Sequence, residues 1–103
     1  MNAFAVLAEP ARRQILDVLV TGERPVTDLV DAVGISQPNV SKHLRVLREA
    51  GMVTVRVDAQ RRLYQVEPAA LAEIDAWLAP YRRMWTSRLD ALEAHLDNKE
   101  ESA

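Results

Sequence analysis

Apolar residues near the start of the chain recur at steps of three and four, which is the spacing of one face of a helix. Pro10 follows Glu9, and a proline at this point favours either a new helix start or a kink. Gly22 in "TGERP" predicts a loop that ends the helical region. The recurring apolar positions are Phe4, Leu7, Ala8, Ala11, Ile15, Val18 and Leu19.

Two short helices separated by a glycine are predicted for residues 26–50. The first, "VTDLVDAV", ends at Gly34, and the second stops at "AG" before residue 52. Ser36 suits the N-cap of the second helix because its hydroxyl can accept a hydrogen bond from a free amide, and Pro38 lies where no N–H is needed. The inward-facing positions are Leu29, Val30, Val33, Val40, Leu44 and Leu47. Two short helices joined in this way form a helix-turn-helix.

The apolar period changes to two after Gly51. In "MVTVRV" the side chains of Val53, Val55 and Val57 point to one side, and "RLYQV" resumes the alternation after "DAQR". This pattern predicts a β-hairpin.

Helical spacing returns over residues 67–96. Pro68 suits a first turn, and Pro80 is predicted to divide the region into two helices. The second of these carries a narrow line of apolar residues with charges on both flanks, which is typical of a helix that packs on another helix. We call this line the apolar stripe: Tyr81, Trp85, Leu89, Leu92 and Leu96. The predicted fold is therefore mostly α with a small β-hairpin, as one domain over residues 1–97 and a short polar tail over residues 98–103.

Composition narrows the possible functions. The chain has 103 residues, no cysteine and two histidines, which excludes disulfides, thiolate metal sites and a cysteine nucleophile. No signal peptide or membrane span is readable, so a soluble cytoplasmic protein without membrane association is expected. The net charge of −2 argues against a protein that coats nucleic acid by bulk charge. Residues 36–67 are nevertheless positive, with six basic and three acidic side chains, whereas both flanking regions are negative.

Hydrogen-bonding and basic side chains gather on the outer face of the helix that begins at Ser36. Amides read adenine edges and Arg reads guanine, while Ser and Lys contact bases or phosphates. His43 lies on the same helix, where a DNA contact and a partly buried position are equally expected. The residues of this face are Gln37, Asn39, Ser41, Lys42, Arg45 and Arg48. In the hairpin, Arg56, Arg61 and Arg62 form a second basic cluster suited to the DNA backbone.

Two other function classes are less favoured. Ser41 and His43 are two apart on a helix and point away from each other, as do Glu73 and Asp75, so neither pair supports catalysis, and no enzyme is expected. A winged helix used only for protein contact is the stronger alternative. A helix face that binds a protein should expose aromatic or aliphatic anchors, whereas the outer face of the helix that begins at Ser36 exposes amides and cations.

Three motifs in order, "LAEPARRQILDVL", "SQPNVSKHLRVLREAGMV" and "RRLYQV", resemble the ArsR-type winged helix-turn-helix transcriptional regulators over roughly residues 4–96. The resemblance implies a homodimer that binds a double-stranded, pseudo-palindromic operator, represses transcription and is often released by a ligand. Matched by position, it implies base reading by Gln37, Ser41 and Lys42, to which the chemistry of the helix adds Asn39. Backbone contacts are expected from Val26, Ser36, His43, Arg45, Arg56, Arg61 and Arg62. Dimerisation through the first and last helices is expected to use Phe4, Leu7 and the apolar stripe.

The chain departs from the family pattern at two places. Many family wings turn through a glycine, whereas this turn reads "VDAQRR". Metal-responsive members use a cysteine pair in the first helix of the helix-turn-helix, or His and carboxylate ligands on the last helix. Here the first site reads "TDLVDAV", and Asp90, Glu93 and His95 lack the paired-histidine pattern. We therefore expect no metal and no cofactor, as in the metal-independent branch; an unknown small-molecule effector and no effector both remain open.

Overall fold

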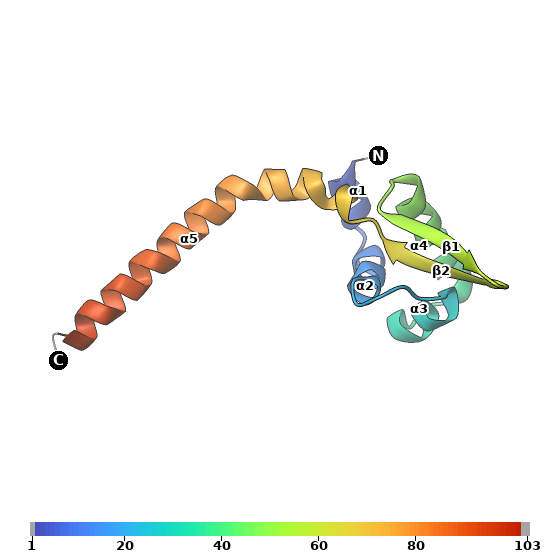
Figure 1. Ribbon diagram of the computed structural model, residues 1–103, viewed down its shortest axis with the longest axis horizontal. Coiled ribbons are helices and arrows are strands. Elements are labelled where there is room, and N and C mark those ends of the chain that lie inside the picture. Colours follow the sequence, from blue (N-terminus) through green and yellow to red (C-terminus); the bar gives the residue numbers. More distant parts are fainter. Residues whose placement is uncertain (1, 102–103) are drawn as a thin grey trace. The chain divides into compact units, whose positions relative to one another are not determined.

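The structure is a computed structural model of the chain and describes residues 2–101. The elements are α1 (Ala3–Leu7), α2 (Pro10–Leu19), α3 (Val26–Val33), α4 (Gln37–Glu49), β1 (Val53–Asp58), β2 (Arg61–Val66), a 3-10 helix η1 (Pro68–Leu71) and α5 (Ala72–Glu101). Figure 1 labels the five α-helices and the two strands of the described chain. The elements form two compact units, which divide after Ala72. The fold class predicted from sequence, mostly α with a small β-hairpin, is confirmed.

The N-terminal region contains two helices rather than one kinked helix. Pro10 is the first residue of α2, and Glu9 before it has an extended backbone. At the first position of a helix the backbone N–H has no partner within the helix, so its absence in proline costs nothing. The chain can therefore turn between Leu7 and Pro10 and start a new helix. Of the two alternatives that the sequence left open, the structure selects the helix start.

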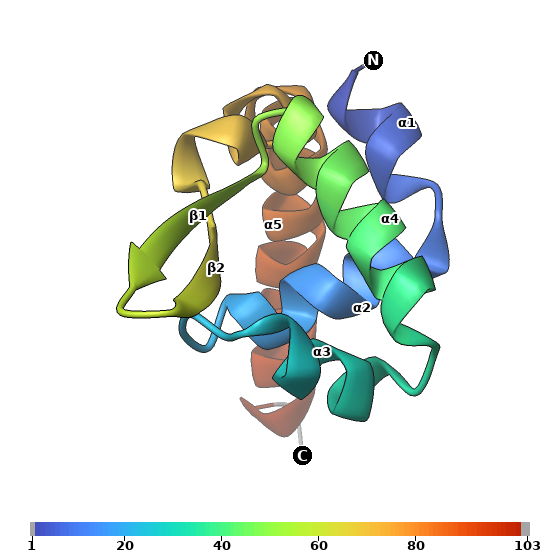
Figure 2. The ribbon, with the colours of Figure 1, turned by 90° about the vertical axis from the view of Figure 1, so that its right-hand side faces the viewer.

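The core of the first unit lies between α2, α3 and α4 and the inner side of the hairpin. Figure 2 shows α2, α3 and α4 crossing one another, with β1 and β2 beside them. The largest fully buried side chains come from the helices α1 to α4 and from the residue just before β1, and they are Val6, Ile15, Leu29, Val40, Leu44, Leu47 and Met52. One small core thus holds both helices of the helix-turn-helix and the base of the hairpin.

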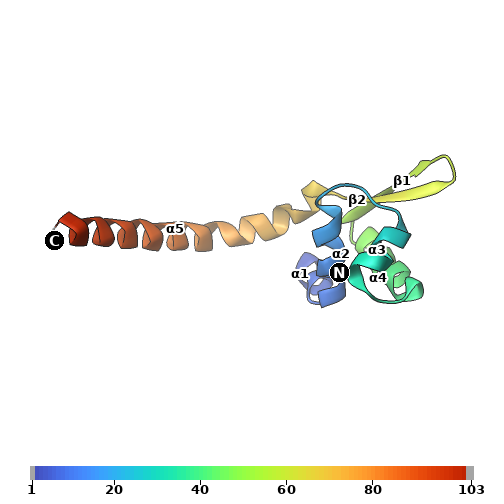
Figure 3. The same ribbon diagram turned by 90° about the horizontal axis from the view of Figure 1, so that it is seen from below.

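β1 and β2 form an antiparallel pair in which Val53 lies opposite Val66 and Asp58 lies opposite Arg61. The two strands and their turn, residues 53–66, are the wing. Its base is held in the core by Val53 and Leu63, which are both buried. Its outer part extends beyond the helices (Figure 3), where Val57 is 69% exposed.

The C-terminal unit is a single helix, which corrects the prediction that Pro80 divides it into two. α5 runs from Ala72 to Glu101 with Pro80 inside it. A proline removes one hydrogen bond, and a helix of 30 residues has enough other bonds to continue past it with a bend. The helix includes residues 98–101 of the predicted polar tail, and residues 102 and 103 lie outside the described part of the chain.

Candidate nucleic-acid interface

α4 is anchored by one face and presents the other to solvent. Val40, Leu44 and Leu47 are at most 1% exposed, so the helix cannot rotate without leaving the core. Gly34 sets its angle to α3, because Gly34 ends α3 in the left-handed conformation with φ 77° and donates its amide hydrogen to the Val30 carbonyl. The turn of the helix-turn-helix therefore fixes which side of α4 faces outward.

The first turn of α4 is capped as the sequence predicts. The Ser36 hydroxyl accepts a hydrogen bond from the Asn39 amide at 3.4 Å. The remaining free amides of this turn give the helix start a partial positive charge, which favours a phosphate nearby. Gln37 is the first helical residue, and Val26 is the half-buried first residue of α3.

The polar face of α4 consists of Gln37, Asn39, Ser41, Lys42, Arg45 and Arg48, which are all exposed. Within residues 2–101, none of these side chains forms an ion pair or a side-chain hydrogen bond with the folded chain. A shallow hollow on this face is lined by Pro38, Ser41, Lys42 and Arg45. These donors and acceptors are therefore available to a ligand without breaking any contact of the protein.

His43 lies at the edge of this face and is half-buried. Among the described residues, its buried Nδ1 atom has no hydrogen-bond partner. The partly buried position expected as one alternative is thus what the structure has, and a contact from this ring to the DNA backbone stays a prediction.

Arg61 and Arg62 begin β2 and are exposed at the outer part of the wing. The wing turns without a glycine because Ala59 adopts the left-handed conformation, with φ 58°. An L-residue with a Cβ atom is disfavoured there, so this turn carries local strain. The missing glycine noted in the sequence does not prevent a tight turn, since Asp58 and Arg61 still pair across it.

Arg56 is placed differently from the other two wing arginines. Its guanidinium donates two hydrogen bonds to the carboxylate of Glu23, from Nε to Oε2 at 2.8 Å and from Nη2 to Oε1 at 2.5 Å. These hydrogen bonds lower the pKa of Glu23 below its usual value of 4.5 and raise the pKa of Arg56. Glu23 was not singled out from the sequence, because 33 residues separate the two partners and no local pattern links them.

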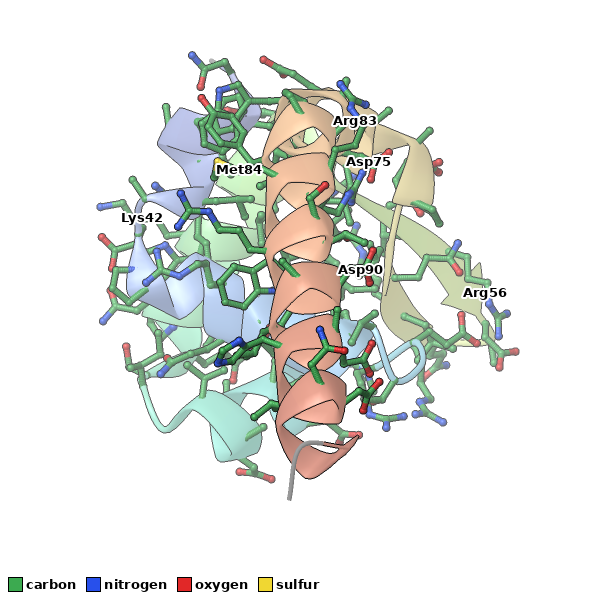
Figure 4. The ribbon with its side chains drawn as sticks, turned by 90° about the vertical axis from the view of Figure 1, so that its left-hand side faces the viewer. Lys42, Arg56, Asp75, Arg83, Met84 and Asp90 are labelled. Carbon is green, nitrogen blue, oxygen red and sulfur yellow. The ribbon has the colours of Figure 1, made fainter. Side chains whose placement is uncertain are left out.

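Figure 4 shows Lys42 and Arg56 at opposite edges of the first unit. Arg61 and Arg62 lie on the same wing as Arg56, so the unit offers exposed basic side chains at two separated places, one on α4 and one on the wing. This spacing suits a ligand with a long, regularly charged surface better than it suits a small molecule.

α5 exposes the apolar stripe along its length. Trp85 is 62% exposed and Leu89 is 44% exposed, and the other members lie in the same range. Trp77 and Met84 are also exposed and widen the apolar surface beyond the predicted residues. Met84 lies on the side of α5 opposite Asp75 and Arg83 (Figure 4). From α1, Phe4 is 40% exposed and Leu7 is half-buried.

The described residues contain neither a cluster of metal ligands nor a membrane-spanning helix. No group of three or more His, Asp or Glu side chains is placed to hold a metal ion. No helix among residues 2–101 is both long enough and apolar enough to span a membrane.

A helix-turn-helix followed by a wing, with amides and cations exposed on its second helix, defines the winged helix-turn-helix class of DNA-binding proteins. Comparison with known proteins supports the same class. Residues 9–55 match the model of the family described as "Bacterial regulatory protein, arsR family". An HTH-type transcriptional regulator of Mycobacterium tuberculosis is 35% identical over 98 residues, which cover 95% of this chain and 89% of the relative. The chain therefore belongs to the ArsR family of bacterial regulatory proteins.

Solved structures extend this agreement to the fold. A possible transcriptional regulator for arsenical resistance aligns with a TM-score of 0.70 and 38% identity over 91% of this chain and 95% of its own. A possible ArsR-family transcriptional regulator from Mycobacterium bovis aligns with a TM-score of 0.59 and 29% identity over 84% and 78%, and its winged helix-turn-helix domain is described as homodimeric. DNA-binding regulation is thus supported over the alternative of a protein-interaction module, and the chain belongs to a family of transcriptional regulators.

Proposed function

We propose that this chain is a transcriptional repressor that binds a pseudo-palindromic operator as a homodimer. The polar face of α4 carries this proposal, because it holds amide, hydroxyl and cationic groups that no other part of the described chain uses. Several curated relatives are named as repressors, which supports repression rather than activation. A dimer bound over a promoter would exclude the polymerase.

Base reading is assigned to the start of α4. In the proposed complex this end of the helix enters the major groove, where Gln37 and Asn39 pair with adenine edges and Lys42 with guanine. Ser41 contacts a base or a phosphate. The buried side of α4 holds the helix backbone in place, so little backbone freedom is lost when DNA binds and the remaining cost is the ordering of these side chains.

Backbone contacts are assigned to groups around this end of α4 and on the wing. Arg45 and His43 lie farther along the helix, Ser36 and Val26 lie at the helix starts, and Arg61 and Arg62 lie on the wing. Contacts of this kind fix position and orientation but do not select sequence.

The homodimer is assigned to α5 together with α1. The apolar stripe is too long and too exposed for an isolated helix in water, and a symmetric partner would cover it. Two-fold symmetry would place the two copies of α4 about 34–36 Å apart, one turn of DNA, which is why a pseudo-palindromic site is proposed.

We further propose that neither a metal nor a cofactor is needed, that any effector is a small molecule, and that the protein acts in the cytoplasm.

Two substitutions test the division between base reading and backbone contact. Gln37→Ala should weaken operator binding by about 1–3 kcal/mol and leave random DNA unaffected, because a base contact acts only on the right sequence. Arg62→Ala should weaken both DNAs alike and reduce the slope of log affinity against log salt by about 0.9, the value for one phosphate contact. Equal losses of Gln37→Ala on the two DNAs would refute base reading by that residue.

A further inference from the structure

The loop between α2 and α3 is held rigidly at the end of α2. The Thr21 hydroxyl donates a hydrogen bond to the Val18 carbonyl at 2.6 Å, and Arg24 Nη2 donates one to the Thr21 hydroxyl oxygen at 3.2 Å. The amides of Thr21 and Gly22 also donate to carbonyls of the last turn of α2. Because Leu19 in that turn is buried, the loop is fixed relative to the core of the first unit.

The same loop pairs with the wing through its backbone. The Arg24 amide donates to the Tyr64 carbonyl at 3.0 Å, and the Tyr64 amide donates to the Arg24 carbonyl at 2.8 Å. These two bonds make Arg24 an isolated bridge along the edge of β2 that does not face β1. One strand of the wing is therefore attached to the loop at a single residue.

The ion pair of Glu23 and Arg56 attaches the other strand. Glu23 belongs to the loop and Arg56 belongs to β1, so this contact reaches across β2. Its two parallel hydrogen bonds define a direction as well as a distance, which a single contact does not. The pair is exposed to solvent, so its importance is for orientation rather than for global stability.

We propose that Glu23 and Arg56 are positioning residues, whose ion pair sets the angle of the wing so that Arg61 and Arg62 reach the DNA backbone. On this assignment Arg56 is not itself a phosphate contact, which revises the role expected from its sequence position. The inference rests on the proposed function, since it concerns how the same interface binds DNA. The opposite possibility is that Glu23 only masks Arg56, which would then leave Glu23 and bind phosphate.

The two possibilities predict opposite couplings between the residues. If the pair positions the wing, Glu23→Gln harms DNA binding only while Arg56 is present. If Glu23 masks a phosphate contact, Glu23→Gln helps DNA binding most while Arg56 is present. Loss of one negative charge near DNA raises affinity in either case, but this general effect is the same in both backgrounds and cancels in the comparison.

A double-mutant cycle measures this coupling. Operator affinity is determined for the wild-type protein, Glu23→Gln, Arg56→Gln and the double variant at one salt concentration. We expect the change in operator affinity caused by Glu23→Gln to be about threefold to tenfold less favourable in the wild-type background than in the Arg56→Gln background. This difference is the cost of ordering a loosened wing when DNA binds. An effect that is equal in the two backgrounds, or more favourable in the wild-type background, would overturn the proposal.

A second measurement needs no DNA and separates failure of this inference from failure of the proposed function. Hydrogen exchange of the Tyr64 amide, which donates to Arg24, should become at least severalfold faster in both single variants. The Met52 amide, which donates to the Leu47 carbonyl outside the wing, should keep its wild-type rate as an internal control. If the wild-type protein binds no operator but the Tyr64 amide exchanges faster in both variants, the proposed DNA-binding function is refuted, whereas the anchoring of the wing by Glu23 and Arg56 is supported. Unchanged exchange at Tyr64 would overturn the anchoring itself.

Discussion

Leu89→Glu is expected to separate the homodimer into monomers. Leu89 lies in the middle of the apolar stripe and is 44% exposed in the single chain. Full burial of a leucine side chain contributes about 1.5–3 kcal/mol, so covering the exposed fraction in a dimer contributes about 0.7–1.3 kcal/mol for each copy. Two-fold symmetry doubles this, and a change of 1.4 kcal/mol is a factor of ten. Loss of burial alone therefore weakens the dimer about tenfold to a hundredfold, and the cost of burying a carboxylate adds to it.

Sedimentation equilibrium over a range of protein concentrations measures this change, and operator binding should weaken with it because one monomer contacts only half of the site. Ser87→Glu is the matched control. It adds the same charge to the same helix two residues away, about 200° around the axis from Leu89, and therefore on the other face. If Leu89→Glu remains as dimeric as the wild-type protein, or if Ser87→Glu dissociates equally, the interface is not the apolar stripe.

Two further predictions concern the wing. Ala59→Gly should raise the free energy of unfolding by about 0.5–1 kcal/mol in urea titration, because glycine adopts the left-handed conformation without strain although it gains freedom in the unfolded chain; a loss of stability would show that Ala59 is unstrained. The pKa of Glu23 in the folded protein is lower than its usual value of 4.5. Its ion pair with Arg56 therefore holds the wing fully above pH 4.5, and this attachment is lost as the pH falls through the pKa of the folded state. The Tyr64 amide should therefore lose protection in acid with a transition below pH 4.5 that Glu23→Gln lacks, and identical profiles for the two proteins would contradict this assignment.

Much of the fold followed from local patterns in the sequence. The helical spacing of Val40, Leu44 and Leu47 matched their burial, and a Ser36 cap with Gly34 before it defined the helix-turn-helix. These features depend on neighbours within one turn, so the sequence carries them directly. The same spacing predicted the polar face of α4, because the residues of this helix that do not pack in the core must face solvent.

Other features depended on packing or on distant residues. Pro80 is a helix breaker by local rules, yet α5 continues through it, since a single lost hydrogen bond does not end a long helix. The left-handed Ala59 was not anticipated, because an alanine gives no signal for that conformation. Above all, the contact of Arg56 with Glu23 joins two segments that only the folded chain brings together, so no local pattern in the sequence predicts it.

The proposed function requires that this chain recognises a particular DNA sequence through α4. Fluorescence anisotropy of the purified protein, with a duplex from upstream of its own gene and a scrambled duplex of the same composition, tests it between 50 and 200 mM salt. We expect affinity for the upstream duplex about a thousandfold or more above that for the scrambled one, with a steep decrease of both as salt rises. Equal and weak binding to both duplexes, together with equal weak binding across a library of randomised sites, would contradict it.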